Sequence, residues 1–240
     1  MTLGTKLVRA YFNFIYNSVY DFTTGKLAAY RELQDRCVNE FKFEDGDEML
    51  CVGVGTGNEI IHILKTNCNV SIVGVDYSET ALKKTFQKVL ASGKQIEVFN
   101  MDAQSLGFED GSFDKVLCLH VMDFVEDAQK VTSEIIRVLR DQGQFVITYP
   151  SDKEGVKLGR NLFKYNIHYS HDSKINNIKA FLKSIMQMVV SSIYLPLLLR
   201  SNKKSYSRTR LTALIAGLTE GGFNIDEDVV YQDYIVCGKK

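Results

Sequence analysis

The sequence predicts an α/β protein built on a seven-stranded, mostly parallel sheet. Three observations indicate this fold: strand and helix patterns alternate between residues 48 and 149, glycines gather where the first strand should end, and a helix and two strand patterns close the chain. Strands that alternate with helices are joined by right-handed crossovers, which make the strands parallel. The 240 residues, 45% of them hydrophobic, suffice for one domain with a modest insertion.

The elements of this sheet are expected in the following order. Two helices should lie between residues 5 and 41, because apolar side chains recur there at helical spacing. Strands are then expected at residues 48–53, 70–76, 95–101, 113–119 and 142–149. Helices are expected between them at residues 57–66, 78–92 and 127–140, the last with a buried stripe of Val131, Ile135, Val138 and Leu139.

The end of the chain predicts how the sheet is completed. A helix over Thr209–Thr219 should end at the following glycine pair. Two strands, Phe223–Tyr231 and Tyr234–Gly238, should then form a hairpin with a tight turn. The chain is therefore expected to divide into a helical cap (residues 1–45), a cofactor-binding core (46–150), an inserted lid (151–207) and a C-terminal helix and hairpin that complete the core (208–240).

The glycine-rich turn after the first strand is the most informative motif. Gly53, Gly55 and Gly57 alternate with other residues, and Asp76 ends the second strand pattern. Glycines let the backbone approach a ligand, and a helix start offers unpaired N–H groups to it. A carboxylate at the tip of the second strand can accept hydrogen bonds from a ribose diol. This turn therefore predicts a cofactor that contains a nucleoside, although Asn58 stands where a dinucleotide fingerprint would have its last glycine.

Five segments, in order, resemble the class I S-adenosylmethionine-dependent methyltransferases. The G-x-G-x-G spacing resembles the first motif of that family, Val73–Ser78 its second, and Asn100–Ala103 the segment after its third strand. Leu106–Val116 and Val138–Phe145 resemble the segments that lead into strands four and five. The resemblance covers about residues 46 to 150 and is greatest to the ubiquinone and menaquinone biosynthesis type. It implies a Rossmann-like sheet whose last strand is antiparallel.

The resemblance implies S-adenosylmethionine as cofactor and S-adenosylhomocysteine as product. The three glycines would approach the methionine and the ribose, and Asp76 would hold the ribose hydroxyls. Tyr77 would flank the adenine, and Asp102 would accept a hydrogen bond from its amino group. The other residues expected at the cofactor are Val54, Met101, Ala103, Leu119 and Tyr20.

Cys51 departs from the pattern of this family. Its position usually holds Asp or Glu, which orients the methionine end of the cofactor, and a neutral thiol cannot replace a carboxylate in that role. Asn58 and Glu59, at the start of the next helix, are the candidates to compensate.

His120 is the candidate catalytic residue, because it follows the fourth strand, where the reacting methyl group should point. Its ordinary pKa suits a general base near neutral pH. The alternative is a histidine that packs under the cofactor, and Asp123 is a candidate partner for its ring. Methyl transfer from a sulfonium needs no metal, so His168 and His171 are interpreted as part of a polar loop and no metal site is expected.

The insertion ends in an apolar helix near residues 181–199, followed by a basic stretch. One interpretation is a lid or core helix, and the other is a peripheral membrane contact through residues 181–210. An apolar lid predicts a small, lipophilic acceptor, namely a quinone precursor or a phospholipid headgroup, and Tyr16 and Tyr20 are further candidates for its pocket.

Composition and charge argue against some other classes of protein, and two alternative functions stay open. A formal net charge of zero argues against a nucleic-acid binder. Five cysteines with no paired spacing, no signal peptide and no membrane span predict a cytoplasmic protein, with association at a membrane surface left open. The alternative functions are a protein that binds the cofactor without methyl transfer and an NAD-dependent oxidoreductase. The oligomeric state is left open.

Overall fold

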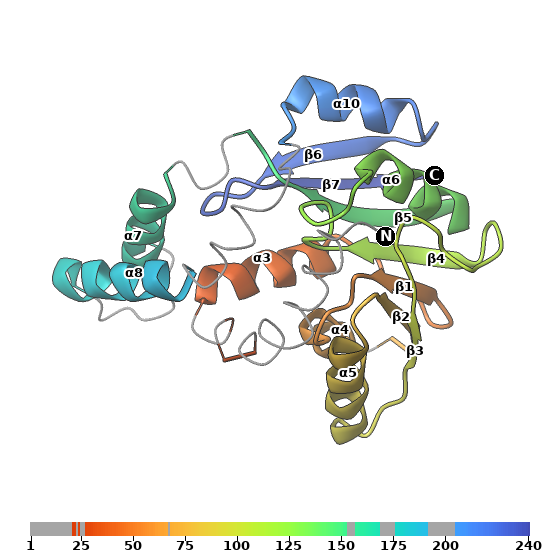
Figure 1. Cartoon of the computed structure of the whole chain (residues 1–240), viewed down its shortest axis with the longest axis horizontal. Coiled ribbons are helices and arrows are strands. Elements are labelled where there is room, and N and C mark those ends of the chain that lie inside the picture. The colour runs from red at the N-terminus through yellow and green to blue at the C-terminus, as the bar shows by residue number, and fades with distance from the viewer. Residues whose placement is uncertain are drawn as a thin grey trace.

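The computed structural model describes residues 21–22, 24, 27–66, 68–152, 157–168, 176–191 and 205–240. Within them, a seven-stranded sheet has the order β3-β2-β1-β4-β5-β7-β6 (Figure 1). Its strands are β1 (Glu48–Val52), β2 (Ser71–Asp76), β3 (Glu97–Asn100), β4 (Phe113–Cys118), β5 (Leu139–Tyr149), β6 (Phe223–Glu227) and β7 (Tyr234–Lys239). The first five are parallel, and β7 runs antiparallel between β5 and β6. The predicted sheet is confirmed.

Helices cover both faces of the sheet and build two apolar layers. The first layer packs under α3 (Ala28–Asn39), α4 (Asn58–Ile63) and α5 (Glu79–Ala91). The second packs under α6 (Ala128–Val138) and α10 (Arg208–Ala216). Cys51 and Cys118 lie in these layers as buried thiols, on the central strands β1 and β4.

Helices α5 and α6 begin at residues whose side chains cap them. Ser78 Oγ accepts a hydrogen bond from Ala81 N (3.3 Å), and Asp127 Oδ1 accepts one from Lys130 N (3.1 Å). The prediction for the end of α6 is wrong by two residues, because Leu139 already pairs with Phe113 and begins β5. Leu139 is buried as expected, but in a strand rather than in a helical stripe.

The C-terminal hairpin places its connection at the carboxyl edge of the sheet. Tyr234, the first residue of β7, pairs with Tyr149, the last residue of β5. Residues 228–233 join the two strands in place of the expected tight turn, and the Asp228 carboxylate accepts hydrogen bonds from the N–H groups of Val230 and Tyr231. An antiparallel strand therefore brings side chains to the edge at which the parallel strands end.

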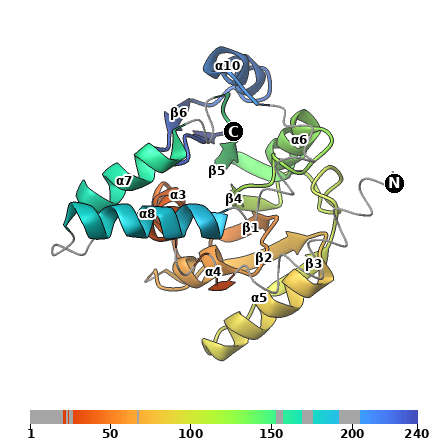
Figure 2. The same ribbon diagram turned by 60° about the vertical axis from the view of Figure 1, so that its left-hand side comes forward.

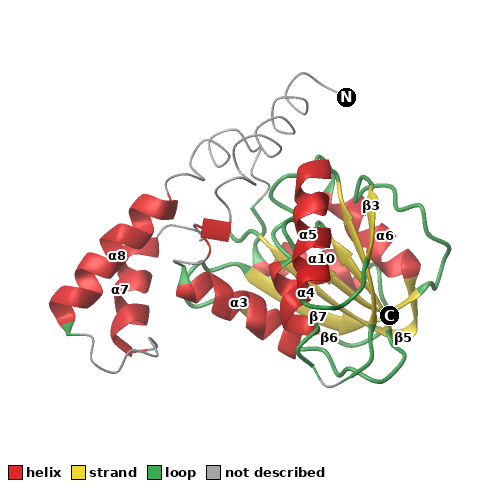
Figure 3. Cartoon of the chain, turned by 90° about the horizontal axis from the view of Figure 1, so that it is seen from below, coloured by secondary structure: helices red, strands yellow, loops and turns green. Residues whose placement is uncertain are grey.

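The insertion leaves and rejoins the core at one point and forms a helical pair. Ser151 and Tyr206 form a bridge at its base. Its described helices, α7 (Leu158–His168) and α8 (Asn177–Ser191), lie side by side and project from the side of the domain next to α3 (Figures 2 and 3). Helix α7 was expected only as a polar stretch. In the described part of the chain, no helix has the length and hydropathy that a membrane span requires.

Helix α7 is attached to the core near α3. Tyr165 Oη donates to Glu32 Oε2 (2.6 Å), and Asn161 Nδ2 donates to the carbonyl of Val230 (3.2 Å). Leu162 is fully buried against Ala29 and Val230. These contacts join the insertion to the 228–233 connection. The division of the chain at residues 45, 150 and 207 stays a prediction, and the first N-terminal helix, with Tyr16 and Tyr20, lies outside the described residues.

Candidate active site

The glycine turn between β1 and α4 has a backbone that favours glycine at three positions. Gly53, Gly55 and Gly57 have φ values of 68°, 53° and 75°. A Cβ on Gly53 would lie 2.1 Å from Val121 Cγ2, and one on Gly57 would lie 2.8 Å from Thr85 Cγ2. Among the described residues, a Cβ on Gly55 would meet nothing nearer than the Gly53 carbonyl oxygen at 3.9 Å. Packing therefore explains two of these glycines, whereas no described residue fills the space beside the third.

Asp76 locks this turn to the end of β2. Its Oδ2 accepts a hydrogen bond from Gly55 N (2.9 Å), and its Oδ1 accepts one from Ser78 N (2.8 Å). The side chain is buried, and burial raises its pKa above the ordinary value. The Tyr77 N–H also bonds to this carboxylate, so three backbone donors share its roughly four acceptor positions and about one is left for a ligand. Beneath the turn, Val54 is buried and packs over Gly74.

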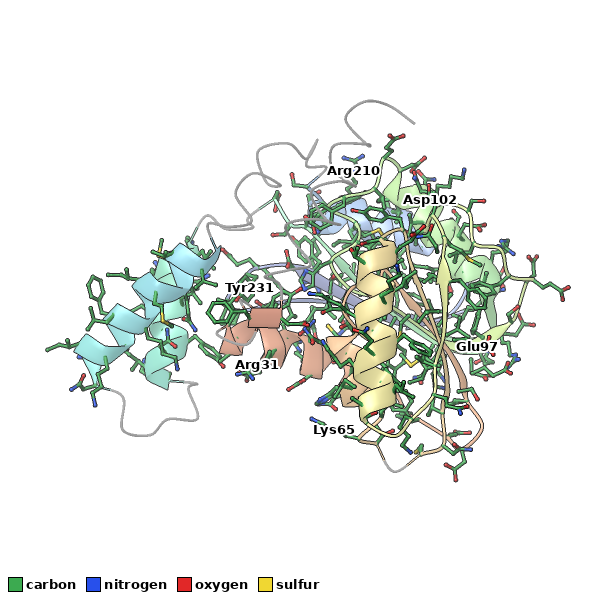
Figure 4. The ribbon with its side chains drawn as sticks, turned by 60° about the horizontal axis from the view of Figure 1, so that its bottom comes forward. Arg31, Lys65, Glu97, Asp102, Arg210 and Tyr231 are labelled. Atoms are coloured by element: carbon green, nitrogen blue, oxygen red, sulfur yellow. The ribbon has the colours of Figure 1, made fainter. Side chains whose placement is uncertain are left out.

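The end of β3 lies beside Asp76. Met101 N donates to the Asp76 carbonyl oxygen (3.2 Å), which places the Met101–Ala103 segment at the same edge, next to Tyr77. The Asp102 side chain is exposed (Figure 4) and accepts a hydrogen bond from Gln104 N (2.9 Å). The structure thus gathers the predicted residues of β1, β2 and β3 around one strand edge. Tyr20 lies outside the described residues.

Glu59 supplies a buried carboxylate beside Cys51. Cys51 is buried, and burial raises the pKa of its thiol, so the thiol is neutral. Glu59, in the first turn of α4, is 9% exposed, and burial raises its pKa to about 7. The charge of Glu59 acts on the Cys51 thiol. Asn58, the other candidate, is engaged elsewhere, because its Oδ1 accepts a hydrogen bond from Lys88 Nζ (2.6 Å).

Asp21 ties the N-terminal segment to the glycine turn. Its Oδ1 accepts a hydrogen bond from Thr56 Oγ1 (2.6 Å), and Lys88 Nζ donates to the same oxygen (3.1 Å). Thr85 Oγ1 also donates to the Gly55 carbonyl (2.8 Å). Contacts from α5 and from the chain before α3 therefore hold the turn in place.

His120 lies just past β4, after the buried residue Leu119. Its φ is 54°, which is uncommon for a residue with a side chain, and its N–H donates to Thr148 Oγ1 (2.7 Å). Burial lowers the pKa of its imidazole to about 4, so the ring is neutral at physiological pH. Its Nε2 is buried and has no hydrogen-bond partner in the part of the chain that the structure describes. A neutral imidazole with such a nitrogen can accept a hydrogen bond or a proton from a ligand. The expectation of a near-neutral pKa at His120 is wrong, because burial disfavours the charged imidazolium.

The surroundings of His120 come from distant parts of the chain. The Tyr30 ring lies 4.9 Å from the imidazole, and Tyr231 packs edge-on against Tyr30 at 5.9 Å, both measured between ring centroids. Asp233 Oδ2 lies 3.7 Å from His120 Nδ1, so the structure pairs His120 with Asp233 and not with Asp123 as expected. Figure 4 shows Tyr231 beside α3, on the side that faces α7 and α8.

None of Tyr30, Tyr231 and Asp233 was predicted as a site residue. Tyr231 and Asp233 precede an antiparallel last strand, whose start must lie at the carboxyl edge of its parallel neighbours. The position before an antiparallel last strand was the signal in the sequence that could have identified Tyr231 and Asp233. In the described residues, no three potential metal ligands lie together; His171 lies outside those residues.

The comparison with known families decides between the candidate cofactors. Residues 50–147 match the family model described as a methyltransferase domain. The matched segment runs from β1 through most of β5 and contains the glycine turn, Asp76 and His120. This segment is a class I S-adenosylmethionine-dependent methyltransferase domain. The family implies S-adenosylmethionine as the cofactor, and this decides against the nicotinamide alternative.

Individual relatives agree with this assignment. A phosphatidylethanolamine N-methyltransferase of Cereibacter sphaeroides is 33% identical over 132 residues, which are 54% of this chain and 62% of that protein. The ubiquinone/menaquinone biosynthesis C-methyltransferase UbiE of Geotalea uraniireducens is 30% identical over 133 residues, 53% of this chain and 57% of that protein. The matches therefore span about three fifths of these relatives' length.

A solved structure shows the same fold as the methyltransferase domain. A methyltransferase from Methanosarcina mazei superimposes with a TM-score of 0.58 at 16% identity, over 85% of this chain and 96% of that one.

The residues of the methyltransferase domain fit S-adenosylmethionine. No described residue fills the space opposite Gly55, so a ligand can lie against the turn, and Asp76 keeps an acceptor position for a ribose hydroxyl. The cofactor carries a positive sulfonium and a positive ammonium group, and the buried carboxylate of Glu59 is a complementary charge. When bound, the cofactor supplies an activated methyl group.

Proposed function

We propose that the chain transfers a methyl group from S-adenosylmethionine to a small, lipophilic acceptor, either a quinone precursor or a phospholipid headgroup. The observation that supports this most is the neutral, buried Nε2 of His120. The His120 ring packs on Tyr30, which packs on Tyr231, at the edge of the sheet where the glycine turn lies, here called the cofactor edge. An apolar wall with one proton acceptor suits a lipophilic molecule that must lose a proton. Two relatives named above, a phosphatidylethanolamine N-methyltransferase and a UbiE protein, point to the same two acceptor classes.

In this proposal, each residue at the cofactor edge has one task. Gly55 lets the backbone approach the cofactor, Asp76 accepts a hydrogen bond from a ribose hydroxyl, and Tyr77 and Asp102 face the adenine. Glu59 pairs with the ammonium of the methionine end, in place of the acidic residue that Cys51 replaces. Val54 supports the turn, and Met101, Ala103 and Leu119 line the edge.

His120 serves as the base. An amine nucleophile leaves methylation with one proton too many, and a ring carbon must lose its hydrogen, so both acceptor classes release a proton. His120 Nε2 accepts that proton, and the nearby Asp233 carboxylate stabilises the imidazolium that forms. Alignment of the acceptor with the methyl group supplies most of the remaining acceleration.

His120→Gln is expected to lower kcat by about a hundredfold, because it removes the proton acceptor. The affinity for S-adenosylhomocysteine should remain that of the wild type, since the proposed cofactor residues are untouched. Kinetics and calorimetric titration of both proteins measure the two effects. His62→Gln is the control, because His62 lies on α4 beside Asp35 (Nδ1 to Oδ1, 3.1 Å). A histidine that only packs under the cofactor would instead change binding and kcat together.

The acceptor class is tested with methyl-labelled S-adenosylmethionine, purified protein and cell extract separated into organic and aqueous phases. Label is expected in the organic phase. Label confined to the aqueous phase would contradict a lipophilic acceptor. If neither phase takes up label while S-adenosylhomocysteine still binds, the chain binds the cofactor without transferring methyl, which is the alternative that the loss of an acidic residue at Cys51 favours.

A further inference from the structure

The outer face of α8 is apolar and exposed. Seven large apolar side chains on this helix are between 42% and 72% exposed: Ile178, Phe181, Leu182, Ile185, Met186, Met188 and Val189. They recur at intervals of three and four residues, so they cover one continuous side of the helix. In a helix that belongs to a core, this side would be buried. The expectation that the helix packs as ordinary core is therefore wrong for its described residues.

The inner face of α8 is polar where it meets α7. Ser184 and Gln187 are buried, and Asn166 Nδ2 of α7 donates to Ser184 Oγ and to Gln187 Oε1, both at 2.9 Å. Buried polar groups need their partners, so these hydrogen bonds fix the rotation of α8 about its axis. Two of the seven apolar side chains lie at the border of the outer face and contact α7: Met188 Sδ would be 2.9 Å from a Cβ on Gly159, and the Phe181 ring lies 6.4 Å from the Phe163 ring between centroids. The other five exposed side chains, Ile178, Leu182, Ile185, Met186 and Val189, lie on the side of the helix opposite Ser184 and Gln187 and are thus directed away from α7.

The charged side chains on the described parts of α7 and α8 are all basic. The described residues of the helical pair, 157–168 and 176–191, contain no Asp or Glu. Their basic side chains are Lys157, Arg160, Lys164, Lys179 and Lys183. An exposed apolar side flanked by basic groups is complementary to a surface that offers hydrocarbon and negative charge together.

We propose that the α7–α8 pair docks the protein on an anionic lipid bilayer, with the outer side of α8 in the interface. A second copy of the chain fits this surface less well, because a twofold contact would bring the same basic groups together. The proposal names a partner surface and stands whether or not the methyl acceptor is a lipid. Because α7 contacts α3 and the 228–233 connection, docking would hold the His120 edge close to the membrane.

The test is co-sedimentation of the full chain with vesicles of phosphatidylcholine, with and without phosphatidylglycerol. The wild type should bind the anionic vesicles, and binding should weaken with salt. Leu182→Glu should lower the partition coefficient about tenfold, because it places a charge in the apolar face. Leu90→Glu is the matched control: Leu90 is 59% exposed on α5 and Leu182 is 60% exposed on α8, so only the position differs.

Lys179→Glu tests the charge without changing an apolar residue, and it should weaken binding to anionic vesicles while S-adenosylhomocysteine affinity stays unchanged. Absence of wild-type binding to anionic vesicles would overturn the proposal, as would equal binding by Leu182→Glu and Leu90→Glu. A wild-type dimer that Leu182→Glu converts to a monomer, with no vesicle binding, would overturn it in favour of a second copy. If Leu182→Glu fails to fold by circular dichroism, Lys179→Glu decides: unaltered vesicle binding by that variant contradicts the proposal.

Discussion

Gly55→Ala is expected to fold and to bind S-adenosylhomocysteine at least about fivefold more weakly than the wild type. The added methyl group would enter the space opposite the turn, where nothing in the described chain lies nearer than the Gly53 carbonyl oxygen. Steric overlap with a bound ligand costs about 1–3 kcal/mol, or about fivefold to 150-fold in affinity. Isothermal titration calorimetry measures the affinity, and thermal unfolding measures the accompanying loss of stability.

Gly93→Ala separates steric overlap from backbone strain. Gly93 has a φ of 74° two residues beyond the end of α5, and a Cβ there meets no described atom within 4 Å. Both variants place a side chain in the left-handed region, which costs about 1–2 kcal/mol of folding stability. They should therefore unfold at similar temperatures, while only Gly55→Ala loses the ligand. Equal affinities in the two variants would mean that the cofactor does not lie against Gly55.

Glu59→Gln is expected to weaken S-adenosylhomocysteine binding by about tenfold to a hundredfold, because a charged hydrogen bond contributes about 1.5–3 kcal/mol. The wild-type affinity should rise with pH through about 7, where Glu59 ionises in the free protein. Ligand binding near that pH should release a proton, which calorimetry in buffers of different ionisation enthalpy detects. The variant should show neither effect.

The unfolding stability of the free protein should change with pH in the direction opposite to the ligand affinity: it should fall as pH rises. Burial raises the pKa of Glu59 from 4.5 to about 7, so the folded state holds this proton more tightly than the unfolded chain does. The stability that this proton confers is present at low pH and is lost as pH rises through about 7. Above that pH, unliganded Glu59→Gln should unfold at a higher temperature than the wild type. Glu79→Gln, at an exposed first-turn position of α5, should change neither property. A Glu59→Gln variant that is less stable and binds normally would assign Glu59 a purely structural role.

The sheet and the cofactor edge could be predicted because their signals are local. The glycine turn, Asp76 and the segment at Met101 each follow a strand, and parallel strands bring their ends to one edge of a sheet. Strand boundaries were predicted to within a few residues where turn residues separate the elements. The end of α6 could not be predicted in this way, because no turn residue separates Val138 from Leu139. Pairing with β4 decides which residue begins the strand β5.

The acceptor side could not be predicted because it is assembled from distant segments. Tyr30 of α3 and Asp233 before β7 reach His120 only once the antiparallel strand is in place. A sequence pattern at His120 favours Asp123, three residues away, over a partner from the end of the chain.

The sequence left the orientation of α8 open between two interpretations, a lid or core helix and a peripheral membrane contact. Its sequence is amphipathic, and a helix of that kind is ordinarily expected to turn its apolar side inward. The hydrogen bonds of Asn166 to Ser184 and Gln187 reverse this orientation. Only the contact between two helices could reveal which side faces out.

A calorimetric titration of the purified chain with S-adenosylhomocysteine, with NADH as comparator, tests the central claim most directly. The claim is that the turn at Gly53–Gly57, with Asp76 and Glu59, holds the methyl donor. Saturable binding of S-adenosylhomocysteine at one site per chain, abolished or strongly weakened in Gly55→Ala and absent for NADH, is the predicted result. No binding of S-adenosylhomocysteine, or equal binding of both compounds, would contradict the claim.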